Sequence, residues 1–342
     1  MFYRRSRIAL PLALVLVLAL AGAALAAAPG GFSDTPVASV ANPTALAFTP
    51  DGRLLIASQT GTLRVYQNDA LLPTAALNLG AGGLNVICPN HERGLLGVAV
   101  DPDFAANHFI YLYYTFNKFP NPDPAQNCPD VQPTNPSNPV NRVSRFVLSQ
   151  ANTVDPASET ILVDNIPSTN GNHNSGDLRF GNDGYLYISI GDGGCDYART
   201  HGCAGGNYAT RDQFILLGKI LRITRDGAIP PDNPWLGADS ARCYDPAPGG
   251  NKAGRNDDGK KCQETFAWGF RNPFRLAFDP NAAGTRFFVN DVGQGTWEEI
   301  DEAQSGADYG WNGREGWLCP ALLRYFEPAP KRIFVQMKEV RE

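Results

Sequence analysis

One short pattern recurs four times along the chain and constrains the fold more than any other feature. In each copy an apolar run ends, a turn rich in Asp, Pro or Gly follows, and a second β-rich run begins. The copies span residues 45–57, 97–114, 178–190 and 276–290. Because Pro and Asp-Gly favour tight turns between strands, each copy predicts a β-hairpin.

Further β-rich runs follow the first two copies, at residues 62–66 and 142–148. Units of about four strands, repeated at intervals of roughly 50 to 100 residues, are typical of propeller blades. We therefore expect an all-β propeller fold with about four blades in this chain. A β-sandwich is the alternative, but it would not repeat one pattern four times. Helical periodicity is weak and confined to residues 211–217.

The composition agrees with a turn-rich β protein. The 342 residues include 35 Gly and 27 Pro, and 43% of them are hydrophobic, enough to build a core. Residues 117–141 and 229–264 are rich in Pro and polar residues and are expected to be long inserted loops. The net charge of −5 argues against a nucleic-acid partner.

The N-terminus has the form of an export signal. Three arginines within the first seven residues precede an apolar run at 8–20, and Ala-Leu-Ala at 24–26 fits a cleavage site. We expect residues 1–26 to be a signal peptide, which implies a periplasmic or secreted protein with no membrane span after cleavage. An uncleaved anchor is the alternative, because apolar residues continue to Ala28.

Export makes disulfide bonds possible for the seven cysteines, and the absence of any Cys-x-x-Cys spacing makes a zinc site improbable. Spacing alone does not decide the connectivity. Pairing of sequence neighbours would join Cys88 to Cys128, Cys195 to Cys203, and Cys243 to Cys262. Cys319 is then left without a partner.

The third hairpin carries a candidate for proton transfer. His173 lies in a polar turn before the hairpin, and Gly191-Asp192-Gly193-Gly194 follows it. Imidazole titrates near neutral pH, and glycines let a backbone approach a ligand closely. The alternatives are a turn histidine and an ordinary blade turn. The other histidines, His91, His108 and His201, are expected to be exposed loop residues.

Several segments together resemble the pyrroloquinoline-quinone (PQQ) dependent soluble glucose/sorbosone dehydrogenases. They occur in family order over about residues 42–318, and they are residues 92–104, the hairpin after His173, 216–223, 269–273, 291–300 and 308–311. The resemblance implies a six-bladed propeller. Relatives in this family include periplasmic aldose dehydrogenases and the propeller of hedgehog-interacting protein.

The resemblance also implies roles for single residues. His173 matches the general base that takes the proton of the sugar hydroxyl. Arg271 and Asn272 match the pair that contacts the quinone oxygens, where Arg271 would stabilise developing negative charge. The backbone carbonyls of Gly293 and Gln294 match ligands of a calcium ion that acts as a Lewis acid on the quinone.

Two further residues, Glu299 and Tyr309, match ligands of a structural calcium. For Glu299 the alternative is a solvated strand residue, and for Arg271 it is a structural ion pair. The implied activity is oxidation of the C1 hydroxyl of an aldose to a lactone, with hydride transfer to PQQ and an external electron acceptor. A non-catalytic binding module for carbohydrate or protein is the alternative. A calcium-dependent propeller lactonase is disfavoured. Such an enzyme needs several carboxylate and Asn side chains around a central calcium ion, and the sequence shows no such set.

The end of the sequence departs from the family. The family places cationic cofactor-binding residues in its last two blades, and this chain ends before them. We therefore expect an incomplete propeller at residues 27–318 and a divergent tail at 319–342, with only a weak amphipathic helix. Truncation or a frameshift near residue 319 would explain this. Weak activity and association through open sheet edges are then expected.

Overall fold

The structure, a computed structural model, divides into two units, Met1–Ser39 and Val40–Glu342. It describes residues 31–118, 128, 138–168, 170–195, 203, 206–247, 250, 254–255, 259–316 and, as backbone only, 332–336. The predicted signal peptide and Cys319 lie outside these residues. Residues 31–39 have no regular secondary structure.

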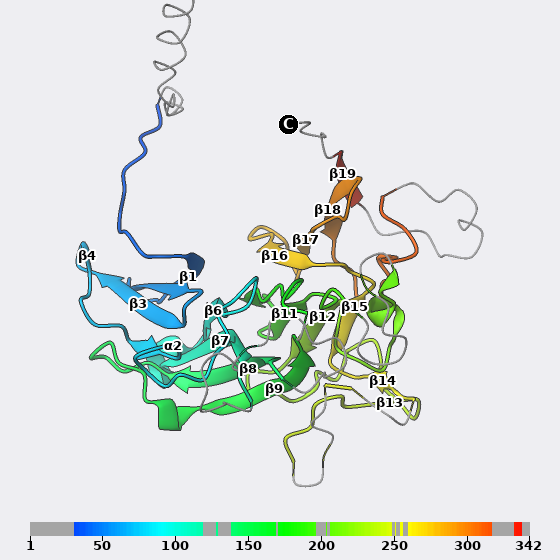
Figure 1. Ribbon diagram of the computed structural model, residues 1–342, viewed down its shortest axis with the longest axis horizontal. Coiled ribbons are helices and arrows are strands. Elements are labelled where there is room, and N and C mark those ends of the chain that lie inside the picture. Colours follow the sequence, from blue (N-terminus) through cyan, green and yellow to red (C-terminus); the bar gives the residue numbers. More distant parts are fainter. Residues whose placement is uncertain are drawn as a thin grey trace, which may run out of the picture. The chain divides into compact units, whose positions relative to one another are not determined.

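Four antiparallel sheets of four or five strands follow one another along the second unit (Figure 1). The first contains β1 (Pro43–Phe48), β2 (Leu54–Ser58), β3 (Thr62–Gln67), β4 (Ala70–Leu71) and β5 (Leu77–Asn78). The second contains β6 (Leu95–Val100), β7 (Phe109–Phe116), β8 (Val140–Val147) and β9 (Thr160–Pro167). The third contains β10 (Leu178–Phe180), β11 (Leu186–Ile190), β12 (Lys219–Ile223) and β15 (Thr265–Trp268). The fourth contains β16 (Pro273–Phe278), β17 (Phe287–Asp291), β18 (Trp297–Glu302) and β19 (Arg332–Gln336).

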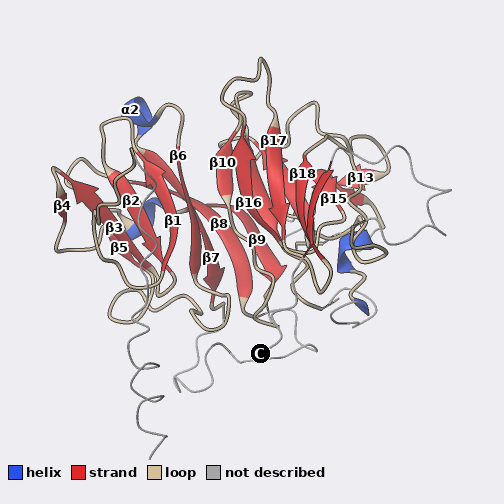
Figure 2. Ribbon diagram, turned by 90° about the horizontal axis from the view of Figure 1, so that it is seen from above, coloured by secondary structure: helices blue, strands red, loops and turns tan. Residues whose placement is uncertain are grey.

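Each sheet opens with one copy of the repeated pattern. The pairs β1–β2, β6–β7, β10–β11 and β16–β17 are all antiparallel, and in the third Leu178 lies opposite Ile188. Figure 2 shows the sheets as successive blades. The prediction of an all-β propeller with four blades in this chain is confirmed.

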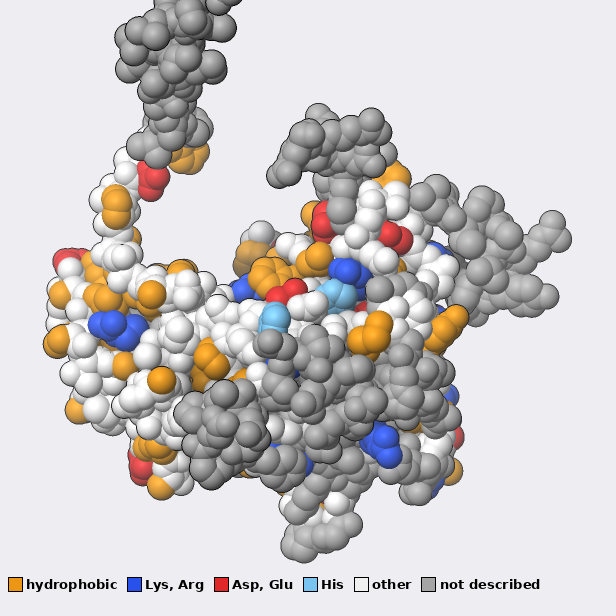
Figure 3. All heavy atoms as spheres, in the orientation of Figure 1, with side chains coloured by type: hydrophobic (Ala, Val, Ile, Leu, Met, Phe, Trp, Pro, Cys, Tyr) orange, Lys and Arg blue, Asp and Glu red, His pale blue; other side chains and the backbone are white. Residues whose placement is uncertain are grey.

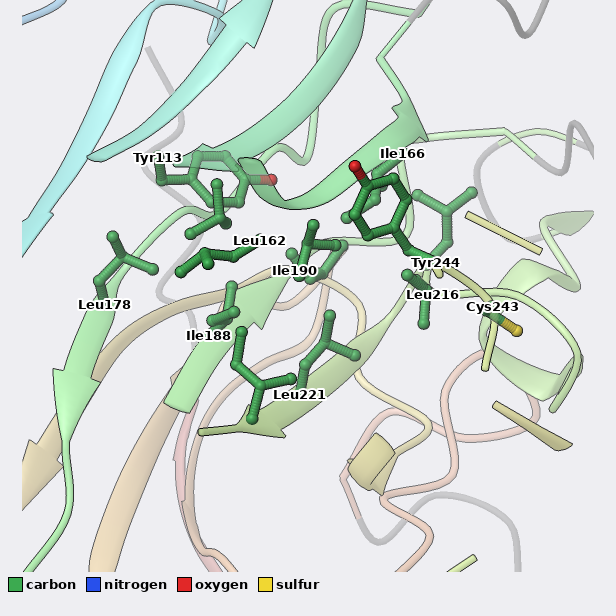
Figure 4. Packing of buried hydrophobic residues seen from close by; sticks show 14 of the residues in the cluster. Tyr113, Leu162, Ile166, Leu178, Ile188, Ile190, Leu216, Leu221, Cys243 and Tyr244 are labelled. Atoms are coloured by element: carbon green, nitrogen blue, oxygen red, sulfur yellow. The ribbon is translucent and has the colours of Figure 1, made fainter. Parts of the chain in front are cut away.

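Apolar side chains fill the space between neighbouring blades. Leu178, Ile188 and Ile190 of the third blade pack with Tyr113 and Leu162 of the second (Figure 4). Every residue of β11 is buried, which explains its unbroken apolar character. Full burial of one such side chain contributes roughly 1.5–3 kcal/mol, so the interfaces between blades hold the loops above them in place.

Two weak helical signals in the sequence have different outcomes: residues 211–217 form no α-helix, whereas most of the tail, where a helix was possible, lies outside the described residues. The weak periodicity near residues 211–217 yields only a 3₁₀ turn, η4 (Ala209–Arg211), because Leu216 and Leu217 are buried in the β11–β12 connection instead. In the tail, residues 332–336 form β19 and pair with β18 rather than forming a helix. The edge of β18 offers backbone donors and acceptors, which a strand can satisfy. In the described part of the chain, the other helices are α2 (Phe104–Asn107) and η2 (Pro156–Ser158).

The disulfide pairing of sequence neighbours is confirmed for all three predicted bonds: Cys88–Cys128, Cys195–Cys203 and Cys243–Cys262. The last one closes the 229–264 insertion, where β13 (Ser240–Ala241) and β14 (Lys261–Cys262) form a short parallel pair. Among the described residues, no helix is both long and apolar enough to cross a membrane.

Candidate active site

The blade topology collects the candidate residues at one end of the sheets. In an antiparallel blade, the loop before the first strand and the loop between the second and third strands leave from the same end. Glu92, His173 and Arg271 precede β6, β10 and β16, whereas Asp192 and Gly293 follow β11 and β17. Figure 3 shows histidine side chains (pale blue) beside acidic and basic ones (red and blue) on one face of the molecule.

A buried carboxylate orients the imidazole of His173. Nδ1 of His173 lies 2.6 Å from Oδ1 of Asp192, a residue that is only 1% exposed. Oδ1 also accepts the backbone N–H of Gly194, at 2.7 Å, and Oδ2 accepts the indole N–H of Trp311, at 2.8 Å. Because an ionised carboxylate only accepts hydrogen bonds, Nδ1 is the donor in this contact, and in the neutral imidazole Nε2 carries the lone pair. This is the arrangement that a general base requires.

The backbone of His173 is fixed as well. Its N–H donates to Oε2 of Glu92 at 2.6 Å, and its φ is 52°. A Cβ added to Gly191 would lie 1.9 Å from the carbonyl oxygen of His173, so only glycine fits there. At Gly191 the glycine-rich loop thus approaches the backbone of His173 closely, whereas its expected approach to a ligand stays a prediction.

Arg271 and Asn272 lie beside this pair. The carboxylate of Asp291 accepts both of their backbone N–H groups, at 3.0 and 2.7 Å. The carbonyl of Arg271 accepts the backbone N–H of Asp192 at 2.8 Å. Oδ1 of Asn272 accepts the hydroxyl of Ser175 at 2.8 Å. The loops that carry His173 and Arg271 are thus joined directly.

The guanidinium of Arg271 faces the β17–β18 turn. Nη1 donates to the carbonyls of Val292, at 3.0 Å, and Gly293, at 2.9 Å. The guanidinium carbon lies 5.5 Å from the ring centre of Trp311. Nε is buried and has no hydrogen-bond partner among the described residues. A buried donor without a partner is costly, and an anionic ligand oxygen would remove that cost.

The β17–β18 turn separates donors from acceptors. The four backbone N–H groups of residues 294–297 donate to Oε1 of Glu315 at 2.8–3.1 Å, and that of Gly293 donates to Glu298 at 3.1 Å. Hard carbonyl oxygens are the kind of ligand that calcium prefers. The predicted ligands, the carbonyls of Gly293 and Gln294, belong to this turn.

Glu299 and Tyr309 have different surroundings. Oxygens of Glu299, Asp291 and Asp301 lie within 4.8 Å of one another, and all three residues are buried. Burial, aided by the nearby carboxylates of Glu299 and Asp192, raises the pKa of Asp291 to about 7, despite its backbone hydrogen bonds. The hydroxyl of Tyr309 donates to the carbonyl of Glu302 at 2.6 Å. A ligand role for Tyr309 would therefore fall to its backbone carbonyl.

Sequence reasoning missed several residues of this site. Asp192 carried a usable signal, because it is an acidic residue among glycines at the end of a buried strand. Asp291 and Trp311 lie in segments that resemble the family but were given no role, and Glu315 carried no signal, since the contacts of all three depend on how distant segments pack. The other described histidines do not join the site: His91 is exposed, and His108 ends α2 in the β6–β7 connection.

Residues 40–244, more than half of the chain, match the family model described as Glucose / Sorbosone dehydrogenase. An aldose sugar dehydrogenase of Escherichia coli is 26% identical over 271 residues, which cover 79% of this chain and 58% of that protein. Quinoprotein glucose dehydrogenase B of Acinetobacter calcoaceticus is 26% identical over 64% of this chain and 40% of its own length. The chain therefore spans only about half the length of these relatives.

The fold agrees with these matches. The PQQ-bound aldose sugar dehydrogenase of Streptomyces coelicolor superimposes with a TM-score of 0.58 at 27% sequence identity, over 83% of this chain and 66% of that one. The chain belongs to the glucose/sorbosone dehydrogenase family.

Proposed function

We propose that this protein is an exported, PQQ-dependent sugar dehydrogenase that oxidises the C1 hydroxyl of an aldose to a lactone. The observation that carries the proposal is the 2.6 Å contact between His173 Nδ1 and the buried Asp192. It leaves Nε2 of a half-buried imidazole as a base at the mouth of the propeller. The three disulfides support export, because such bonds persist in oxidising compartments.

In the proposed reaction Nε2 of His173 takes the proton of the C1 hydroxyl. The C1–H bond breaks, its electron pair leaves as hydride, and the C1–O bond becomes the carbonyl of the lactone. Asp192 stabilises the imidazolium that forms and holds the ring in one orientation. PQQ, when bound, would supply the two-electron acceptor, and the proposed function also requires an external electron acceptor.

The residues present fit the cofactor. Arg271 offers a buried Nε that has no hydrogen-bond partner in the part of the chain that the structure describes, and the amide of Asn272 is oriented by Ser175. These donors would hold anionic and carbonyl oxygens of PQQ. The carbonyls of Gly293 and Gln294 would hold Ca²⁺, which supplies Lewis acidity when bound. Glu299, with Asp291 and Asp301, is the proposed place for a structural cation.

Reconstitution with PQQ and Ca²⁺ tests the proposal. Aldoses should reduce a redox dye in the presence of the wild-type protein, and His173→Ala should lower kcat by at least about 100-fold. His108→Asn is the matched control, because His108 lies at the opposite end of its blade and Asn tolerates its φ of 56°. Dye reduction retained in His173→Ala would refute the assigned base. Fluorescence titration with PQQ reports cofactor binding independently of turnover.

A further inference from the structure

The turn between β17 and β18, residues 293–297, directs all of its backbone N–H groups toward carboxylates. Oε1 of Glu315 accepts from Gln294, Gly295, Thr296 and Trp297 at 2.8, 3.0, 2.9 and 3.1 Å. Oε2 of Glu298 accepts from Gly293 at 3.1 Å. Successive backbone N–H groups that converge in this way form a concave anion-binding turn.

The peptide bonds fix where the carbonyls of this turn point. In a trans peptide the C=O of one residue is antiparallel to the N–H of the next. The carbonyls of residues 293–296 therefore point away from Glu315. One carbonyl of the turn already meets a positive group, because Arg271 Nη1 lies 2.9 Å from Gly293 O; the same nitrogen lies 3.0 Å from the carbonyl of the preceding residue, Val292. The turn thus has an anion side and a cation side.

We propose that Glu315 is the positioning residue of the proposed calcium site: by gathering the N–H groups of residues 294–297, it presents the carbonyls of Gly293 and Gln294 to the cation. This inference rests on the proposed function. Glu315 itself is not a ligand. Glu315 fixes the directions of the carbonyls before the cation binds. The turn therefore loses little conformational entropy on binding.

The position of Glu315 in the chain adds a second link. Glu315 and Trp311 lie on one short segment after β18, and Trp311 donates to the carboxylate that holds His173. The segment therefore contacts both the base and the cation turn.

Calcium affinity and amide exchange together test this role in the full chain. Glu315→Gln keeps the size of the side chain and removes its charge, and Glu315→Ala removes the acceptor. Glu302→Gln is the matched control, because Glu302 ends β18 at the end away from the turn, where its carboxylate accepts a hydrogen bond from Arg286 at 2.8 Å. Isothermal titration with Ca²⁺ alone gives the affinity, and hydrogen exchange of residues 294–297 gives the order of the turn.

The expected result is Ca²⁺ binding weakened by about ten- to hundredfold in both Glu315 variants, with faster exchange at residues 294–297. Protection of the amides of β17 should stay unchanged, which shows that the blade is still folded. Unchanged exchange at 294–297, or unchanged affinity with faster exchange, would overturn the role of Glu315. A wild-type protein that binds no Ca²⁺ although its turn is protected would instead overturn the calcium site of the proposed function.

Discussion

Asp192 Oδ1 lies 2.6 Å from His173 Nδ1, and Asp192 Oδ2 lies 2.8 Å from the indole nitrogen of Trp311. One buried carboxylate thus connects the loop before β10 to the segment after β18. Because both oxygens are occupied, the imidazole is held in one tautomer. The proposed chemistry depends on this pair more than on any other contact.

The variant Asp192→Asn should fold normally, but Nε2 of His173 should no longer act as the general base. The amide can donate to Nδ1, which places the proton on Nε2, where the lone pair is needed. We expect kcat for dye-linked sugar oxidation to fall by about 100-fold or more with a smaller change in KM. Asp226→Asn, in a surface ion pair with Arg145, should behave as the wild type. Equal activity of the two variants would contradict the assigned role of Asp192.

Arg271→Gln should affect the two ligands in opposite directions. Loss of a charged donor should weaken PQQ binding by about ten- to hundredfold. Loss of the positive charge beside the carbonyls of Val292 and Gly293 should tighten Ca²⁺ binding, measured without PQQ, by roughly threefold or more. Arg286→Gln removes a surface charge as the control. Parallel losses of both affinities would show that Arg271 acts on the fold rather than on the ligands.

The pair Cys243–Cys262 should contribute substantially to stability. Its sulfurs join residues 19 positions apart in the sequence, inside the 229–264 insertion. Closing a loop of this length is worth about 3 kcal/mol in the unfolded chain. The double variant Cys243→Ala, Cys262→Ala should lower the free energy of unfolding in urea by about that amount. No change would mean that the insertion unfolds independently of the blades.

Glu264 should make stability fall as pH rises through the acidic range. Burial raises the pKa of its carboxyl in the folded protein, although Tyr244 and Cys243 donate backbone hydrogen bonds to it. The unfolded chain releases this proton near the usual value of 4.5, whereas the folded protein retains it to higher pH. The free energy of unfolding therefore declines from about pH 4.5 upward, by at most about 1.4 kcal/mol per pH unit.

Glu264→Gln tests this dependence, because the amide does not titrate. Above pH 4.5, the usual pKa of a glutamate, the unfolding free energy of the wild type should fall relative to that of the variant as the pH rises. A constant offset across the range would mean that Glu264 is ionised in the folded protein. Glu302→Gln, in a surface pair, provides the baseline.

Much of the fold could be predicted because its information is local. The strand–turn–strand pattern identified the first two strands of all four blades, and sequence neighbours formed the three disulfides. His173 and Arg271 were correctly placed at blade loops from short motifs. Strand β19 was missed, because its pairing depends on the open edge of β18 rather than on its own pattern.

The supporting residues of the site could not be predicted in the same way. Trp311 donates a hydrogen bond to Asp192, which is 119 positions away in the sequence. Ser175 donates one to Asn272, which is 97 positions away. Such contacts follow from the packing of neighbouring blades, which no local pattern encodes. The glycine-rich loop shows the same limit: its composition predicted a close approach, but not that Gly191 would pack against His173.

The most direct test of the central claim is the isotope effect at C1 during turnover. The protein, loaded with PQQ and Ca²⁺, would oxidise glucose and C1-deuterated glucose while dye reduction is followed. The proposal predicts slower oxidation of the deuterated sugar and loss of turnover in His173→Ala. Saturable PQQ binding without any aldose-dependent dye reduction, or turnover that persists in His173→Ala, would contradict it.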